Sequence, residues 1–145
     1  GNRTSILQSL NKTENTIVLG ANSFWEGVDV KGTGLTTLII TKLPFQPPTK
    51  PITSAKMEYI QAQGKNSFSA YSLPQAVLKF RQGCGRLIRS ADDWGSIIIL
   101  DKRLLSKGYG KEFINSLPKQ PIIRKPLDEV CSTLHNWMQQ KAKGK

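Results

Sequence analysis

Three polar side chains with a helical spacing lie within residues 78–90. On a helix that turns about 100° per residue, Gln82, Arg86 and Arg89 fall on one face, at i, i+4 and i+7. Guanidinium groups make paired hydrogen bonds to phosphate oxygens, so the two arginines suit a ligand that carries phosphate. An ordinary amphipathic helix with a solvated basic face shows the same spacing. The residue pattern alone leaves both interpretations open.

The opposite side of this expected helix, which we place at residues 74–90, is apolar. It is formed by Val77, Phe80, Cys84, Leu87 and Ile88. Gly83 and Gly85 lie between these residues, and each glycine costs about 1 kcal/mol relative to Ala inside a helix. That cost suggests that another backbone or a ligand approaches the helix closely.

The composition favours a globular domain with a polyanionic partner. The 145 residues are enough for one domain with a core, and 21 basic against 10 acidic residues give a net charge of +11. A basic surface that only aids solubility is the alternative. Cys84 and Cys131 are too few for a structural zinc site or an iron–sulfur cluster, so we expect no metal site and a reducing compartment. His135 is expected to be a surface helix residue.

The order of the expected elements indicates an α/β fold with a mainly parallel sheet flanked by helices. Short apolar runs predict three buried strands, at 16–21, 35–41 and 96–100. Helical patterns lie at 4–11, 54–63, 74–90, 111–117 and about 126–142. Ligands of such sheets bind beyond the carboxyl ends of the strands, where residues 23–29 follow the first strand. No apolar run is long enough to cross a membrane.

A series of short motifs occurs in one order along the chain. They are Ser23-Phe-Trp-Glu-Gly-Val-Asp29, Lys42-Leu-Pro-Phe45, Gln82-Gly-Cys-Gly-Arg-Leu-Ile-Arg89, Asp93-Trp-Gly95, Asp101-Lys-Arg103, Tyr109-Gly110 and Ser116-Leu-Pro118. Each motif alone is weak, but the ordered set resembles the C-terminal motor domain of the DinG/XPD-type superfamily two DNA helicases, most closely the bacterial DinG group.

The resemblance implies a RecA-like second helicase domain. Residues 1–145 would form part of one such domain, with a core at about 16–118 and a C-terminal helix at about 126–142. Because the chain begins at Gly1 without Met, we expect an incomplete fragment. The phosphate loop and the magnesium-binding acidic box of such motors belong to the first domain. Residues 64–67 do not match a phosphate loop.

By the same resemblance, Arg89 and Arg86 are catalytic residues that reach the γ-phosphate of ATP across the cleft between two motor domains. Such arginine fingers place positive charge where negative charge builds up in the transition state. Gln82 would bond the phosphates or the attacking water, or tie a finger to the cleft. An internal salt bridge from Arg86 to Asp93 or Asp101 is the structural alternative.

The motif at 23–29 is expected to bind nucleotide through Asp29, Gly27 and Glu26. Asp29 would accept a hydrogen bond from the ribose or bond an arginine of the 82–89 motif. Gly27 would let the backbone pass close to the nucleotide, and Glu26 would orient an arginine or fix the loop.

Single-stranded DNA is the expected partner of three further residues. Ser23 would hold a DNA phosphate, Trp25 would stack on a base, and Lys42 would touch the DNA backbone. For Trp25 packing in the core is the alternative, and for Lys42 a solvated side chain. Asp101 and Arg103 are expected to form a local pair that closes the end of a strand.

The resulting expectation is the C-terminal part of an ATP-dependent DNA helicase, inactive as an ATPase alone. It would use ATP and Mg, with the Mg ligands in a missing N-terminal motor domain and no iron–sulfur cluster in this fragment. Its location would be the bacterial cytoplasm, near the nucleoid, with no membrane contact. The alternatives are a stand-alone nucleic-acid-binding module and the helicase-like domain of a 3′–5′ exonuclease.

Overall fold

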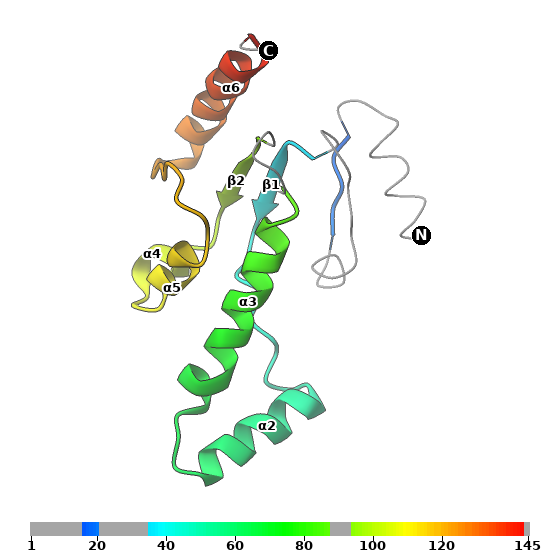
Figure 1. The fold of residues 1–145 in the computed structure, drawn as a ribbon, viewed down its shortest axis with the longest axis vertical. Helices are drawn as coiled ribbons and strands as arrows, with labels where there is room; N and C mark the ends of the chain where they lie inside the picture. Colours follow the sequence, from blue (N-terminus) through cyan, green and yellow to red (C-terminus); the bar gives the residue numbers. More distant parts are fainter. Residues whose placement is uncertain (1–15, 21–34, 88–93, 144–145) are drawn as a thin grey trace.

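The computed structural model describes residues 16–20, 35–87 and 94–143 (Figure 1). The expected helix at 4–11 lies outside these residues. The elements follow the order β1 (Thr37–Ile40), α2 (Pro51–Ala62), η3 (Phe68–Ser72), α3 (Leu73–Cys84), β2 (Ser96–Ile99), α4 (Arg103–Ser106), α5 (Gly110–Asn115) and α6 (Leu127–Lys143).

Strands β1 and β2 pair in parallel, as the alternation of apolar runs and helices predicts. Thr37 lies opposite Ser96 and Ile40 opposite Ile99. The hydroxyls of Thr37 and Ser96 are 3.1 Å apart, and the Leu100 amide donates to the Ile40 carbonyl at 2.9 Å, one residue beyond β2. The helices α2, η3 and α3 form the connection between the two strands, which is the β–α–β order of a parallel sheet.

The prediction of a buried strand at 16–21 is wrong for its described part, residues 16–20. These residues form no regular element, and Ile17 and Leu19 are 87% and 91% exposed. A strand exists only where its amides and carbonyls join the ladder of a neighbour. Within the described residues the sheet contains β1 and β2 only. The apolar character of residues 16–20 was therefore not sufficient to make them a strand.

Helix α2 starts three residues earlier than the expected 54–63, at Pro51. Proline suits the first helical position because its missing N–H has no partner there in any case. Thr53 and Ser54 lie inside the helix, where Thr53 is buried and Ser54 donates its hydroxyl to Glu58. Helix α2 and the first half of α3 project away from the sheet beyond the carboxyl ends of the strands, whereas α6 lies at the other end of the molecule (Figure 1).

Helix α3 ends at Cys84, so the prediction of one helix over 74–90 is wrong at its C-terminal end. The Gly85 amide still bonds the Arg81 carbonyl at 2.9 Å. The next two amides, of Arg86 and Leu87, bond carbonyls only three residues back, at 3.3 and 3.1 Å. Glycines favour helix ends, and such tightened turns satisfy the last carbonyls of a helix. Arg86 therefore lies in a turn after α3, one residue beyond its glycine cap.

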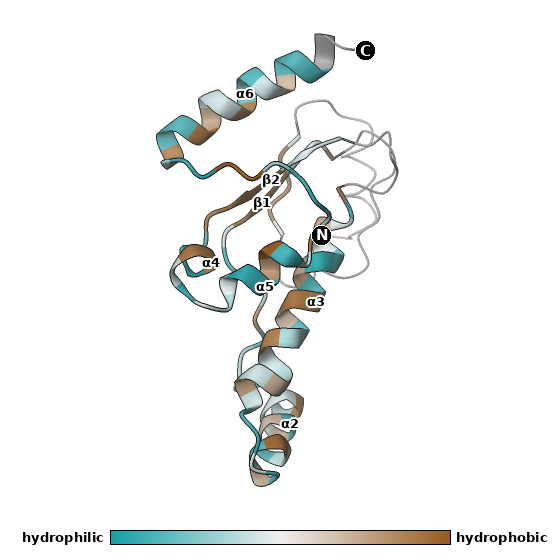
Figure 2. Cartoon of the chain, turned by 60° about the vertical axis from the view of Figure 1, so that its left-hand side comes forward, coloured by the Kyte–Doolittle hydropathy of each residue, from teal (hydrophilic) through white to brown (hydrophobic). Residues whose placement is uncertain are grey.

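The core lies where α3 and α5 meet beyond the carboxyl ends of the strands (Figure 1). Its buried residues are Ile40, Leu43, Ala76, Phe80, Cys84 and Phe113. Phe80 and Phe113 are fully buried and meet edge to face, with ring centroids 5.4 Å apart. Both strands are apolar along most of their length (Figure 2). The predicted packing face of α3 is thus confirmed for Phe80, Cys84 and Leu87, all buried, while Ile88 lies outside the described residues.

Two further helices match their sequence patterns within two residues. Helix α5 spans 110–115, where 111–117 was predicted, and α6 spans 127–143, where 126–142 was predicted. The Trp137 ring of α6 meets Trp94, just before β2, edge to face at a centroid distance of 5.8 Å. This contact ties the last helix to the start of the second strand.

Gly110 is required by the close packing of α4 against α5. It is buried, and a Cβ at this position would collide with the backbone carbonyl of Leu104. We predict that Gly110→Ala lowers the free energy of unfolding by about 1–3 kcal/mol, because a backbone atom cannot give way as a flexible side chain does. Gly108→Ala is the matched control, since nothing lies within 4 Å of a Cβ there. Denaturant unfolding of both variants tests this, and equal stabilities would contradict it.

Candidate functional site at the carboxyl edge of the sheet

The segments that follow β1 and β2 leave the sheet at the same edge. Because the strands are parallel and Ile40 pairs with Ile99, the next residues of each chain segment emerge side by side. Thr41 and Lys42 follow β1, and Leu100 and Asp101 follow β2. The carboxyl edge of a parallel sheet is the usual place for ligands of α/β proteins.

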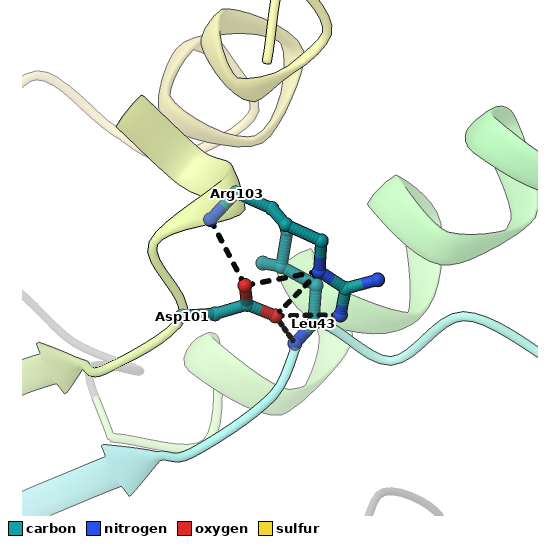
Figure 3. Close-up of polar contacts among 3 residues, drawn as sticks. All are labelled: Leu43, Asp101 and Arg103. Atoms are coloured by element: carbon teal, nitrogen blue, oxygen red, sulfur yellow. Dashed lines mark hydrogen bonds and ion pairs between the residues drawn. The ribbon is translucent and has the colours of Figure 1, made fainter. Parts of the chain in front are cut away.

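The carboxylate of Asp101 joins the two strand ends (Figure 3). Its Oδ2 accepts the Leu43 amide, from beyond β1, at 2.8 Å. The Arg103 guanidinium donates from Nη2 to Oδ2 at 2.6 Å and from Nε to both oxygens at 3.0 and 3.1 Å, and the Arg103 amide donates to Oδ1 at 3.0 Å. The predicted local pair that closes the strand end is confirmed, and it also reaches across to β1.

Hydrogen bonds from Arg103 hold the pKa of Asp101 well below its usual range. Burial of the carboxyl, whose side chain is 6% exposed, opposes this shift, and the amides of Leu43 and Arg103 reinforce it. Asp101 in turn raises the pKa of Arg103. The carboxylate is therefore ionised and fully engaged at neutral pH. It has a structural role, and it is not placed as a general acid or base.

Arg103 also connects this pair to a cluster of aromatic rings. Its guanidinium lies 5.4 Å from the centroid of Phe45. The Phe45 ring contacts Phe68, Tyr109 and Phe113 at centroid distances of 5.8, 5.6 and 5.7 Å. The Lys42–Phe45 and Tyr109–Gly110 motifs, read separately from the sequence, thus meet in one cluster. Their shared role is to fix the loop after β1 on η3 and α5.

An open pocket lies at this edge, lined by Thr41, Lys42, Leu100, Asp101, Lys102 and Arg103. Lys42 is exposed at the strand end, where the sequence places it. Its contact with DNA stays a prediction. Lys102 was not selected from the sequence as a site residue, although its place between Asp101 and Arg103 at a strand end was a usable signal.

The catalytic residues proposed from sequence are described only in part. Gln82 is exposed on the last turn of α3, and Arg86 is partly exposed in the turn that follows. Leu87 anchors this turn by packing against Gly95, where a Cβ would meet Leu87 Cδ1 at 2.7 Å. Arg86 and Gln82 are not among the residues that line the pocket of Lys42. Asp101 forms an ion pair with Arg103, and an internal salt bridge from Arg86 stays a prediction.

The remaining site predictions lie outside the described residues. They concern Arg89 and the residues Ser23, Trp25, Glu26, Gly27 and Asp29. Asp93, the other candidate partner of Arg86, lies outside as well. Their roles stay predictions.

The cysteines and the histidine show no sign of chemistry. Cys84 and Cys131 are both free thiols, and burial raises the pKa of Cys84 to about 12, which makes it unreactive at neutral pH. His135 lies exposed on α6, 2.8 Å from the Gln139 amide, as expected for a surface residue. Within the described ranges, no group of three or more His, Cys, Asp or Glu side chains is placed to hold a metal ion. Nor is any described helix long and apolar enough to cross a membrane.

Comparison with known proteins defines the class. Residues 1–120 match the family model of the helicase C-terminal domain, so the chain belongs to that family. This range includes both strands, the carboxyl-edge pocket and the whole 82–89 motif.

The chain is also similar to curated proteins named DinG and YoaA. The chain is 49% identical over 118 residues to the 3′-5′ exonuclease DinG of Bacillus subtilis, covering 81% of this chain and 13% of that protein. It is 44% identical over 119 residues to the ATP-dependent DNA helicase YoaA of Escherichia coli K12 (82% and 19%). It is 47% identical over 103 residues to the ATP-dependent DNA helicase DinG of Photobacterium profundum (71% and 15%). The chain thus spans less than a fifth of the length of these relatives.

The ionised Asp101 makes a testable contribution to stability. We predict that Asp101→Asn lowers the free energy of unfolding by about 1–3 kcal/mol at pH 7, because buried donors lose their charged acceptor. A depressed pKa stabilises the fold above the unfolded value of about 3.9, and this contribution is lost as the pH falls towards the folded value. The difference between wild type and Asp101→Asn should therefore shrink below about pH 4.

Unfolding by denaturant across the pH range measures this effect. Glu129→Gln is the control, because the Lys125–Glu129 pair is an exposed i, i+4 pair and contributes only about 0.3–0.5 kcal/mol. A difference for Asp101→Asn that stays constant from pH 7 to pH 2 would contradict the assignment.

Proposed function

We propose that this chain is part of the RecA-like second motor domain of a DinG-type, ATP-dependent DNA helicase. The observation that carries the proposal is the match of residues 1–120 to the helicase C-terminal domain, with Gln82, Arg86 and Arg89 at the helicase motif spacing inside it. The parallel β–α–β arrangement supports a RecA-like domain with its core at about 16–118. Residues 1–145 would be one part of that domain, and the first motor domain would belong to the same protein.

The chain would supply half of an ATPase site. Arg86 and Arg89 would act as arginine fingers on the γ-phosphate of ATP bound to the first domain, and Gln82 would bond the phosphates or the attacking water. Delocalised positive charge at that point stabilises the charge that develops as the phosphoryl group is transferred. Support comes from the end of α3, where Gln82 is exposed and Arg86 is partly exposed.

An arginine finger needs a rigid support, and the burial next to Arg86 agrees with such a role. Phe80, Cys84 and Leu87 are buried on one side of the segment that carries Gln82 and Arg86. A guanidinium contributes to catalysis only when it is held in position before the reaction, because reorganisation during the reaction costs free energy. The helix end at Cys84 leaves Arg86 in a tight turn, whose amides are bonded to the carbonyls of α3.

Nucleotide binding would extend to the loop at 23–29. Asp29 would bond the ribose or an arginine, Gly27 would allow close approach of the backbone, and Glu26 would orient an arginine. The Mg ligands are expected in the first motor domain, as the family resemblance implies, and an arginine side chain has no acceptor atom that could ligate Mg. Bound Mg would neutralise charge on the β- and γ-phosphates.

Single-stranded DNA would run over the same domain. Ser23 would hold a phosphate, Trp25 would stack on a base, and Lys42 at the carboxyl edge would contact the backbone. The net charge of +11 favours such a polyanionic partner. Relatives named as DNA helicases support DNA as the substrate, ATP as the fuel and the bacterial cytoplasm as the location.

A second candidate concerns the whole protein. The relative from Bacillus subtilis, which is 49% identical to this chain over 118 residues, is named a 3′-5′ exonuclease. The present chain would then be the helicase-like domain of a nuclease. ATP hydrolysis by the intact protein separates this from a working motor.

The arginine fingers are tested in the intact protein that carries this chain. We predict that Arg86→Ala or Arg89→Ala lowers the kcat of DNA-stimulated ATP hydrolysis by about 10³- to 10⁵-fold, because transition-state charge loses its partner. Binding of single-stranded DNA should be nearly unchanged. Arg89→Lys should not restore the activity, because lysine lacks the bidentate fork.

Arg81→Ala is the matched control, since Arg81 is an exposed arginine one turn earlier on α3. Its ATPase activity should stay close to that of wild type. A stand-alone nucleic-acid-binding module would give the reverse pattern, in which Arg86→Ala weakens DNA binding and flattens its salt dependence.

The chain by itself should not hydrolyse ATP. Its residues offer donors for phosphate but no phosphate loop, so binding of the β- and γ-phosphates would be incomplete. A sensitive phosphate-release assay on the purified chain, with Arg89→Ala as the blank, measures this. Activity that disappears in Arg89→Ala would refute the half-site proposal.

A further inference from the structure

The pocket beyond β1 and β2 holds more positive charge than the proposed function uses. Lys42 lines it from the end of β1, and Lys102 lines it from the end of β2. Both side chains are exposed, and no carboxylate of the described residues forms an ion pair with either of them. Two lysines from different strand ends therefore line one open pocket.

The carboxylate in the same pocket does not cancel this charge. Both oxygens of Asp101 are engaged by Arg103 and by the amide of Leu43. With Arg103 and Asp101 neutralising each other, the pocket keeps the two positive charges of Lys42 and Lys102. An anion that enters meets two cations, and the ionised carboxylate is shielded from it by its own donors.

We propose that Lys42 and Lys102 hold one phosphate group between them in this pocket. The proposal deepens the proposed function and rests on it, because it extends the DNA track from the end of β1 to the end of β2. Thr41 also lines the pocket, and its side chain carries a hydroxyl that can donate a hydrogen bond. Leu100, which is 46% exposed, offers an apolar wall to the neighbouring sugar or base.

A backbone phosphate of a nucleic-acid strand fits this pocket better than a nucleotide phosphate. Nucleotide phosphates are usually cradled by backbone N–H groups of a glycine-rich loop. Residues 41–45 contain no glycine, and the Leu43 amide is already donated to Asp101. Lysines around an open pocket act as point charges, which suits a strand that must slide and rebind.

Lys102 is held in place by its own backbone. Its carbonyl accepts the amides of Leu105 and Ser106 at 3.1 and 3.0 Å, and the residues on either side form the Asp101–Arg103 pair. The Cα of Lys102 is therefore fixed relative to β2, while its side chain is free to reach the ligand.

The salt dependence of DNA binding by the intact protein tests the proposal. The probe is fluorescent oligo-dT, titrated between 50 and 200 mM salt. The slope of the logarithm of the binding constant against the logarithm of the salt concentration falls by about 0.7 for each phosphate contact that a single strand loses. The binding constant of wild type divided by that of Lys102→Ala should therefore fall about 2.6-fold between 50 and 200 mM salt. Lys102→Gln, which keeps a long side chain without charge, should behave the same.

Lys107→Ala is the matched control, because Lys107 is exposed, lies just after α4 and does not line the pocket. Its slope should stay within error of wild type. If Lys102→Ala and Lys107→Ala change the slope equally, only general charge matters and the phosphate site is refuted.

A double-mutant cycle tests whether the phosphate is shared. The combined loss of affinity in Lys42→Ala/Lys102→Ala should be clearly different from the product of the single losses, because contacting residues are coupled. Strict multiplication of the two losses would overturn the shared site. If Lys102→Ala instead raises the KM for ATP and leaves the salt dependence of DNA binding unchanged, the bound phosphate belongs to the nucleotide and the assignment to DNA is overturned.

These outcomes are independent of the arginine test. If Arg86→Ala abolishes ATP hydrolysis while Lys102→Ala leaves DNA binding unchanged, the motor proposal stands and the phosphate site fails. If Lys102→Ala acts as predicted but Arg86→Ala leaves hydrolysis intact, the phosphate site stands on a domain that is not an arginine-finger motor.

Discussion

The bond from the Leu43 amide to the Asp101 carboxylate is the contact on which the carboxyl edge depends. Parallel strands cannot be joined by a tight turn, so their ends are held together only by the ladder and by side chains beyond it. Asp101 supplies that link, and Arg103 extends it to the ring of Phe45. One carboxylate thus connects strand register, the aromatic cluster and the walls of the pocket, which explains why it is buried and ionised rather than free for chemistry.

The two candidate sites are built on the same core in different ways. The lysine pocket follows two strand ends, where the backbone is fixed by sheet hydrogen bonds. The turn that carries Arg86 follows the end of α3, and the buried side chains of Phe80 and Cys84 fix the orientation of that helix end. In both places cationic side chains stand on hydrogen-bonded backbone, which under the two proposals would allow a phosphate to be bound without ordering a loop first. Under the proposed function, these two sites would hold nucleotide and DNA at the same time.

Sequence reasoning predicted the parallel sheet, the packing face of α3 and the local Asp101–Arg103 pair, because each rests on short-range patterns. It failed at residues 16–20, where apolar character without a paired neighbour produced no strand. It also extended α3 past Cys84, because periodicity does not register how two glycines tighten the last turn. Lys102 was overlooked although it lies at the end of a predicted strand. The ring cluster around Phe45 was missed because it depends on contacts between distant segments, which no local pattern encodes.

The strand pair has a further consequence for how the chain reaches this structure. Thr37 and Ser96 are 59 positions apart, whereas α2 and α3 each contact η3, their neighbour in the sequence. Closing a loop of that length costs more entropy than forming a helix turn, and non-local pairing slows folding. The helical connection formed by α2, η3 and α3 is therefore expected to form before β1 pairs with β2. The carboxyl edge, with its lysines and its buried carboxylate, is then assembled last, when the chain is already nearly folded.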